Sequence, residues 1–213
     1  MQAGFQNFVA FFAALLAAAG AAAQVNVVKL GVSEYTTHSR TNGITGVGVP
    51  PGADAETGNA TTIILTYERM LTPEIGAEFV IGLPPKIKAN ATGSVAFLGD
   101  NVLSARNVTP TLFVNYHFGA PGDIWRPYLG AGVNYTKFVR IESKLASDVT
   151  MSDSTGWAAQ AGIDYALNRE WGLFASVAAL RVKSNVVASG ATVLRTTIDF
   201  RPIVYSFGAV YRF

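Results

Sequence analysis

The ionisable side chains of this sequence share a pattern of position. Six of them lie within a few residues of a short turn or of the C-terminus, on the face opposite to their apolar neighbours: Glu68, Glu78, His117, Arg126, Asp164 and Arg212. Buried charges persist only when they are paired. The six residues therefore predict one ionic network, and the chain around them must bring six separate segments to the same level.

The composition limits the classes of protein that remain. Only 14% of the 213 residues are charged and 50% are hydrophobic, with a net charge of +2 and no Cys. A soluble domain usually carries about 25% charged residues, yet after Gln24 no stretch reaches the roughly 18 apolar residues of a membrane-spanning helix. Disorder, a coiled coil and a helical membrane protein are excluded, as are disulfide scaffolds. The near-neutral charge argues against nucleic acid as a partner.

The first residues are typical of a targeting segment. Phe8 to Ala19 form a short apolar run, and Ala21 to Ala23 supply the small residues that a signal peptidase requires. We expect residues 1–23 to be a signal peptide and residues 24–213 to be the folded domain. No Lys or Arg precedes the apolar run, which departs from the usual pattern, and a buried helix is the alternative.

Apolar residues alternate through the rest of the chain. Every second residue is apolar in eight segments: 28–32, 63–67, 77–83, 112–118, 129–135, 157–167, 171–179 and 203–213. This spacing places the apolar set on one face of a pleated strand. The chain is therefore predicted to be all-β, with eight strands.

The connections between these strands alternate in length. Leu71–Glu74, Gly119–Asp123 and Asn168–Glu170 are short, whereas Glu34–Ala60, Pro84–Val108, Val139–Gly156 and Lys183–Arg195 run to 27, 25, 18 and 13 residues. Short turns on one side, long loops on the other, an even strand count and aromatic strand ends are typical of an outer-membrane barrel. We expect an aromatic girdle on the periplasmic side that includes Tyr67, Tyr116, Phe118, Trp171, Tyr211 and Phe213.

A soluble β-sandwich or a lipocalin-like barrel is the rival interpretation. In that case the apolar face would point inward and the other face would meet water. The other face is rich in small residues and poor in charge, as in Gly130, Gly132 and Gly162. Small residues suit the crowded interior of an eight-stranded barrel, so the membrane barrel is favoured. Pro202 is then expected at a bulge or at the outer end of the last strand.

Several segments resemble the OmpW family of small outer-membrane β-barrel proteins. They are Ala60–Tyr67, Thr72–Gly76, Pro110–Leu112, Arg126–Thr136, Trp157–Trp171 and Tyr211–Phe213, in the expected order. The resemblance implies a monomeric barrel in the bacterial outer membrane with a narrow, largely apolar channel for small hydrophobic molecules. The final Phe213 also resembles the signal that such barrels present to their insertion machinery.

The inward positions predict two layers inside the barrel. The six charged residues form a periplasmic plug, which either fills the barrel end or carries protons or ions. The predicted channel lining nearer the outer mouth is apolar: Ile64, Val80, Phe113, Ala178, Leu180 and Val182, with Trp157 beside the third long loop. A few polar residues, among them Gln160, are expected at the same level. Eight strands leave room for little more than side chains, so a packed interior is the alternative to a ligand path.

These layers lead to a functional expectation. A solute that enters an apolar mouth and meets a charged floor leaves most easily sideways, between strands, into the lipid. A structural or receptor barrel with a filled interior is the alternative. No enzyme activity is expected, because Ser176 and Ser206 point inward without a nearby His. His38 and His117 lie at opposite ends and cannot share a metal, and no cofactor is expected.

Overall fold

The computed structural model describes residues 25–37, 40–41, 43–144, 148–189 and 193–213. The predicted signal peptide, residues 1–23, lies outside these described residues. No helix among them is long and apolar enough to cross a membrane. The described elements are β1 (Asn26–Thr36), β2 (Arg40–Thr41), β3 (Ala53–Thr57), β4 (Ala60–Met70), β5 (Ile75–Gly82), β6 (Lys86–Gly93), the 3-10 turn η1 (Ala96–Leu98), β7 (Leu103–Val108), β8 (Thr111–His117), β9 (Trp125–Ser143), β10 (Asp148–Met151), β11 (Ser154–Ala166), β12 (Trp171–Leu180), β13 (Val182–Ser189), β14 (Val193–Phe200) and β15 (Ile203–Arg212).

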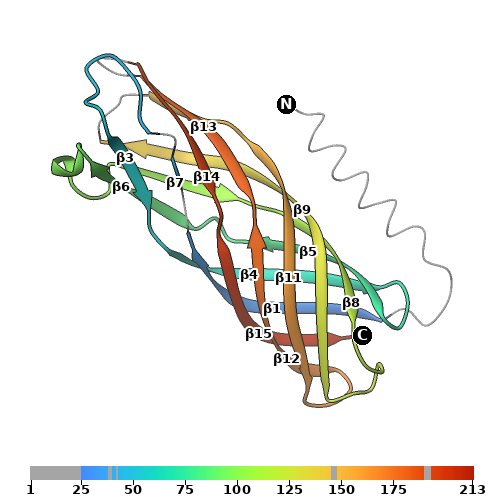
Figure 1. The fold of residues 1–213 in the computed structure, drawn as a ribbon. Coiled ribbons are helices and arrows are strands. Elements are labelled where there is room, and N and C mark those ends of the chain that lie inside the picture. The colour runs from blue at the N-terminus through green and yellow to red at the C-terminus, as the bar shows by residue number, and fades with distance from the viewer. Residues whose placement is uncertain (1–24, 38–39, 42, 145–147, 190–192) are drawn as a thin grey trace.

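A closed ring of antiparallel strands forms the body of the molecule (Figure 1). Its order is β11-β12-β15-β1-β4-β5-β8-β9, and the pairing of β9 with β11 closes it. The first and last strands meet in register, and Asn26 and Phe213 exchange two backbone hydrogen bonds of 2.8 and 2.9 Å. Each of the eight predicted strands is one member of this ring, so the predicted fold class is confirmed.

The outer face of the ring is apolar and exposed. Its residues are the alternating set of the sequence, for example Leu30, Leu65, Leu129 and Phe207, whereas their chain neighbours point inward. Rings contact one another around the end that carries the short turns: Trp125 with Tyr165, Trp171 with Tyr211, and Tyr211 with Phe213. These pairs lie where the aromatic girdle is predicted, and they add Trp125 and Tyr165 to it.

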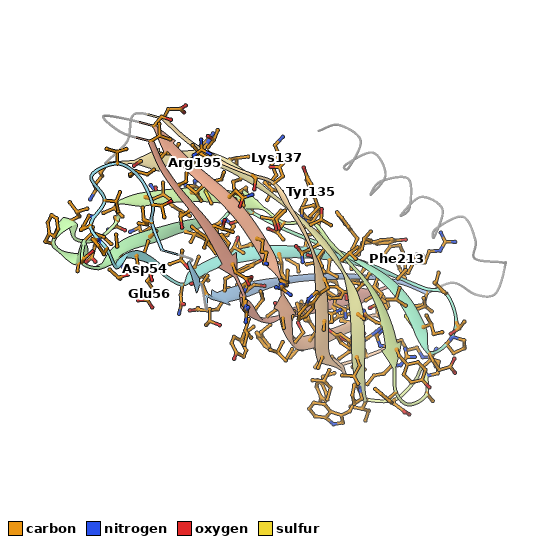
Figure 2. All side chains as sticks on the ribbon, turned by 45° about the horizontal axis from the view of Figure 1, so that its top comes forward. Asp54, Glu56, Tyr135, Lys137, Arg195 and Phe213 are labelled. Carbon is orange, nitrogen blue, oxygen red and sulfur yellow. The ribbon has the colours of Figure 1, made fainter. Side chains whose placement is uncertain are left out.

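Polar side chains hold the short turns. Thr72 Oγ1 accepts a hydrogen bond from the backbone N–H of Ile75 at 2.9 Å. Asn168 Oδ1 accepts one from the N–H of Trp171 at 2.8 Å, and Asp123 Oδ2 accepts one from Ala120 at 2.8 Å. Each side chain accepts a hydrogen bond from a backbone N–H that the tight turn would otherwise leave without a partner. The three turns fall where the sequence predicts them, at the end of the barrel that carries Phe213, opposite Arg195 and Asp54 (Figure 2).

The four long connections fall where the sequence predicts them, and they contain strands of their own. Most of these residues continue as strands beyond the membrane barrel. β3, β6 and β7 extend the sheet from the outer part of β9, and β10, β13, β14 and β2 form a second sheet of four strands. The strands persist because their inner apolar side chains pack together, in the cluster of Val182, Val186, Ile198 and Phe200 with Phe138. The chain therefore carries a folded extension on the side opposite the short turns.

Candidate functional site

A buried lysine lies inside the half of the barrel nearer the short turns, which we call the lower half. Lys29 on β1 is 1% exposed, and its Nζ lies 3.4 Å from Glu68 Oε2 and 3.3 Å from Asp164 Oδ1. Glu78 Oε1 is 3.9 Å away. The same Nζ sits 4.4 Å from the centre of the Tyr128 ring, a cation–π distance. One cation thus joins carboxylates from β4, β5 and β11 across the inside of the ring.

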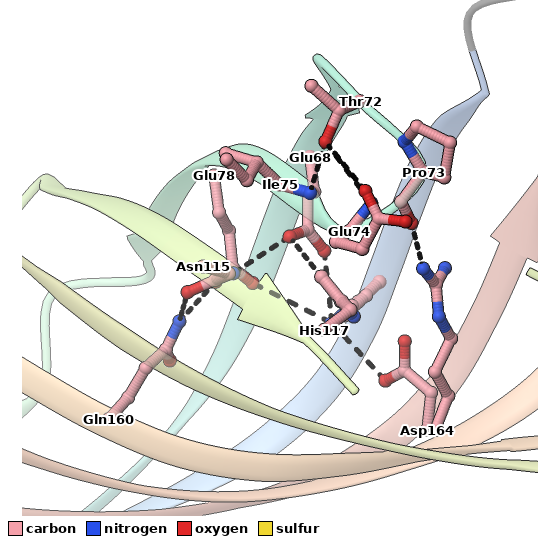
Figure 3. A network of polar contacts seen from close by, with 12 residues as sticks. Glu68, Thr72, Pro73, Glu74, Ile75, Glu78, Asn115, His117, Gln160 and Asp164 are labelled. Carbon is pink, nitrogen blue, oxygen red and sulfur yellow. Dashed lines mark hydrogen bonds and ion pairs between the residues drawn. The ribbon is translucent and has the colours of Figure 1, made fainter. Parts of the chain in front are cut away.

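Amide groups connect the two glutamates in a second layer of contacts (Figure 3). Asn115 Nδ2 donates to Glu68 Oε1 at 2.8 Å and to Glu78 Oε2 at 2.7 Å. Gln160 Nε2 donates to Glu78 Oε2 and, at 2.8 Å, to Asn115 Oδ1. His117 Nε2 lies 2.7 Å from Glu68 Oε1. We call these seven residues the floor: Lys29, Glu68, Glu78, Asn115, His117, Gln160 and Asp164.

Two arginines lie below the floor at the periplasmic mouth. Arg212 Nη2 is 3.8 Å from Asp164 Oδ2, and Arg126 Nη2 donates to the carbonyl of Pro73 in the first turn. Both line an open cavity of about 630 Å³ together with His117 and Asp164. The structure therefore brings four of the six predicted plug residues into the floor and places Arg126 and Arg212 at its periplasmic edge.

Glycines make room for the large floor side chains. A Cβ on Gly162 would collide with the ring of Tyr128, and a Cβ on Gly76 would collide with the carboxylate of Glu68. The inward-facing small residues of the sequence are thus partly explained by close approach, since they face the bulkiest buried groups. Tyr128 is 2% exposed and packs on His117 at 5.1 Å between ring centres.

An apolar layer lies directly above the floor. Phe113, Ala158, Leu180 and Val204 pack together, with Val80, Ala178 and Tyr35 against them. A cavity of only about 40 Å³ remains between this layer and the floor, and Ile64 also lines it. Such a volume holds little more than water. Five of the predicted lining residues (Ile64, Val80, Phe113, Ala178 and Leu180) meet here, and together they fill the passage.

Two predicted lining residues lie elsewhere. Val182 is buried in the extension, in the cluster that includes Val186 and Phe200. Trp157 is 54% exposed on the outside of the wall. Its outward position follows from its alternation with Ala158, which is buried at 2%.

The extension holds an apolar cavity of about 100 Å³ between its two sheets. Residues of both sheets line it, among them Ala89 and Leu103 on one side and Val186 and Ile198 on the other. Apolar side chains thus follow one another from the outer end, through the cluster of Val182 and Phe200, to Phe113 and Leu180 above the floor.

The wall of the barrel loses its backbone pairing at one level. β5 pairs with β8 from Ile75↔Tyr116 to Val80↔Thr111, and the pairing resumes only at Lys86↔Arg106 between β6 and β7. In the described chain, residues 81–85 and 107–110 have no ladder between them. Pro84, Pro85 and Pro110 lie in this stretch and have no N–H to donate. Gly82 and Thr109, one from each side, line the 40 Å³ cavity. We call this unpaired stretch the wall gap.

Sequence reasoning missed Lys29, Asn115 and Tyr128 and placed Gln160 near the outer mouth. Lys29 carried a usable signal, because it is a lone charge between the apolar residues Val28 and Leu30. Asn115 and Tyr128 are ordinary inward residues whose partners come from distant strands. Their role follows only from the register of the ring.

The closed ring, its apolar exterior and its short turns at one end define the class: an eight-stranded β-barrel of the outer membrane. The model of the OmpW family matches residues 7–213, and the chain belongs to that family. It is 34% identical to Outer membrane protein W of Escherichia coli strain K12 over 73% of this chain and 74% of that protein.

Two further proteins are similar to this chain. Dibenzothiophene metabolism operon protein PahQ of Pseudomonas aeruginosa is 32% identical over 69% of this chain and 67% of that protein. The crystal structure of the outer membrane protein OprG from Pseudomonas aeruginosa has a TM-score of 0.80 and 25% identity, covering 90% of this chain and 96% of that chain. The protein is located in the bacterial outer membrane, as its relatives are.

Proposed function

We propose that this protein is a channel for small hydrophobic molecules, with an apolar mouth, a charged floor and a lateral exit into the bilayer. The observation that carries the proposal is the small cavity above the floor. Its lining combines apolar side chains such as Phe113 and Leu180 with polar ones such as Ser33, and it reaches both sides of the wall gap. The name of one relative, which places it in a dibenzothiophene operon, is in keeping with an apolar solute.

The floor supports a sideways route. A hydrocarbon gains nothing from Lys29, Glu68 and Asp164, and separating these charges would leave buried ions unpaired at a cost of several kcal/mol. The wall gap offers a cheaper exit, because no backbone ladder has to break there. Leu83 on its outer rim is 61% exposed and faces lipid. The solute would therefore move from one apolar surface to another.

Entry requires side chains to move, since the cavity holds about 40 Å³. Phe113 and Leu180 close the passage from β8 and β12. They are the expected gate, because both are buried in the one apolar layer between the extension and the floor. Phe113 is 4% exposed and Leu180 is 7% exposed.

Uptake by whole cells tests the proposal. Cells with and without the protein are given an apolar fluorescent probe and a hydrophilic solute of similar size. We expect faster entry of the apolar probe alone. Phe113→Asp and Leu180→Asp should abolish this gain, whereas Phe113→Leu, which keeps the site apolar, should retain most of it. Heat-modified gel mobility checks that each variant is folded, and unchanged uptake in the folded Asp variants would contradict the gate.

The small volume of the cavity also favours a second candidate, a structural or receptor barrel with a filled interior. In that case neither solute enters faster when the protein is present. The Asp variants then differ from the wild type only in stability. The extension would in that case be the functional surface, and its ligands would be sought among molecules outside the cell.

A further inference from the structure

A hollow of about 430 Å³ lies on the outside of the barrel wall, away from the floor and the wall gap. Its apolar surface comes from Trp157, Ala179, Pro202 and Ile203, and Arg181 and Arg201 border it. The two arginine side chains are 43% and 51% exposed. We call these six residues the outer groove.

Strand breaks at one level create the outer groove. β12 ends at Leu180 and β13 begins at Val182. In the strands paired with them, β14 ends at Phe200 and β15 begins at Ile203. The backbone is nevertheless fixed, since the Leu180 N–H donates to the carbonyl of Pro202 and the Arg181 N–H to that of Trp157, both at 3.1 Å. Because β12 and β13 do not form one continuous strand, the surface is hollowed here.

The groove lies at the boundary between hydrocarbon and headgroups. Trp171 and Phe213 belong to the aromatic girdle at the periplasmic end. Arg181 lies ten residues after Trp171, just past the end of β12, and Ile203 lies ten residues before Phe213 on the antiparallel strand β15. Ten strand residues rising about 3.3 Å each, tilted by about 40°, span about 25 Å, which is the height of the apolar band of such barrels. Arg181 and Arg201 are thus at the level of the outer leaflet's headgroups.

The charges at this level are mainly basic. Arg201 Nη2 lies 3.0 Å and Arg181 Nη2 3.7 Å from the same carboxylate oxygen of Asp199. Lys183 is the register partner of Asp199 on β13. The one carboxylate therefore orients two guanidinium groups and leaves an excess of positive charge over an apolar surface.

The neighbouring carboxylates are engaged elsewhere. Glu34 on β1 is the register partner of Tyr205 on β15, and it accepts a hydrogen bond from Thr61 Oγ1 at 3.3 Å. Asp153 accepts one from the Tyr135 hydroxyl at 2.7 Å. Neither carboxylate forms an ion pair with Arg181 or Arg201 among the contacts of the described residues.

We propose that the outer groove binds the lipid A part of lipopolysaccharide. Arg181 and Arg201 would hold a phosphate of its headgroup, because a guanidinium donates paired hydrogen bonds to phosphate oxygens. An acyl chain would lie on Trp157, Ala179 and Ile203. The outer leaflet is the source of the lipid, because the groove is at the barrel end opposite the short periplasmic turns, where lipopolysaccharide replaces ordinary phospholipid. The site lies on the outer face of the wall, and it shares one lining residue, Leu180, with the cavity above the floor.

Native mass spectrometry of the detergent-solubilised full chain tests this assignment. The protein is titrated with lipid A that carries both phosphates, with lipid A from which the phosphates are removed, and with phosphatidylglycerol. We expect the phosphorylated lipid A to bind at least tenfold more tightly than either of the others, since each basic contact at a membrane surface strengthens binding about fivefold. Equal binding of all three lipids would overturn the proposal without recourse to any variant.

Paired variants locate the site. Arg181→Gln with Arg201→Gln should weaken binding of phosphorylated lipid A about tenfold and leave that of the dephosphorylated lipid unchanged. The matched control is Lys88→Gln with Lys144→Gln, which removes two exposed cations of the extension, away from the groove. An equal loss in both double variants would mean a general charge effect and would refute the groove. Trp157→Ser should weaken both lipids, since it removes apolar contact area.

Discussion

Lys29 decides whether the floor is stable. It is one cation among three carboxylates, and it is only 1% exposed. Its contacts come from β4, β5 and β11, so its charge offsets repulsion between groups that would otherwise meet inside the ring. The floor is thus an arrangement in which removal of one residue leaves several others without a partner.

Replacing Lys29 by Met should destabilise the protein by at least about 3 kcal/mol, because buried carboxylates lose their counter-ion. The measurement is urea-induced unfolding in lipid vesicles, followed by tryptophan fluorescence. Lys88→Met, at an exposed position of β6, serves as the control and should change stability by less than about 0.5 kcal/mol. A stable Lys29→Met protein would show that the floor is not held by its charges.

The pair of Lys86 and Glu142 gives a prediction about pH outside the membrane. Their side chains are 2.9 Å apart in the extension, and the hydrogen bond from Lys86 holds the pKa of Glu142 below its usual range. Lys86→Gln should raise that pKa toward the ordinary value, measured by NMR titration of the carboxyl carbon. In the wild type, the contribution of this pair is present above the unfolded pKa and is lost as the pH falls through the lowered one. An unmoved pKa in Lys86→Gln would contradict the contact.

At the scale of elements, the wall gap is the place where neighbouring strands are free to part. β5 remains attached to β4 through Ile64↔Gly82, and β7 remains attached to β9 through Val108↔Lys137. The two halves of the wall are therefore each anchored on their far side. A side-chain contact closes the outer end, where Arg106 Nη1 donates to the carbonyl of Pro84 at 3.1 Å.

Cross-linking the gap should block uptake of the apolar probe. The natural chain has no Cys, so Leu83→Cys with Val108→Cys places the only two thiols on either side of the gap, where a cleavable bifunctional reagent can join them. We expect uptake to fall on cross-linking and to return when the linker is cleaved. Val114→Cys with Ala131→Cys, a pair within the intact ladder of β8 and β9, should have no effect. Equal uptake before and after cross-linking of the gap would exclude exit by this route.

The sequence predicts elements better than it predicts contacts. Alternation identifies all eight barrel strands, because one face of each must meet lipid. It misses β13 and β14, because these strands lie beyond the lipid-facing part of the barrel and the outward positions of β13 carry polar residues such as Lys183 and Asn185. Gln160 was expected near the outer mouth from its distance to the turn, yet it reaches Glu78. Strand tilt and register decide this depth, and neither can be counted along the chain.

At the scale of the whole molecule, the hairpin of β13 and β14 is separable from the membrane ring. The membrane ring is closed by pairings that end at Ala179↔Ile203, while Val182↔Phe200 begins the hairpin of β13 and β14. The apolar cavity between the two outer sheets belongs to the extension alone. The extension should therefore affect solute capture more than it affects folding.

Replacing residues 183–199 by a short turn tests this separation. The shortened protein should still show the heat-modified gel mobility of a closed barrel, because no pairing of the ring is removed. Its uptake of the apolar probe should decrease several-fold at low probe concentration. A matched replacement of residues 94–101, at the tip that follows β6, should have a smaller effect. Full uptake without the hairpin would show that the extension does not help capture.

The position of Lys29 has a consequence for assembly. Its strand, β1, joins the ring through β15, the last strand of the chain, and its contact with Asp164 crosses the interior to β11. The ionic contacts of the floor therefore become complete only when the two ends of the chain have met. Lys29 can meet Glu68 and Glu78 on the neighbouring strands β4 and β5 before closure, but the Asp164 carboxylate on β11 gains its contact with Lys29 only in the final step. Closure is consequently the cooperative event of folding, and the floor makes partly closed barrels unstable.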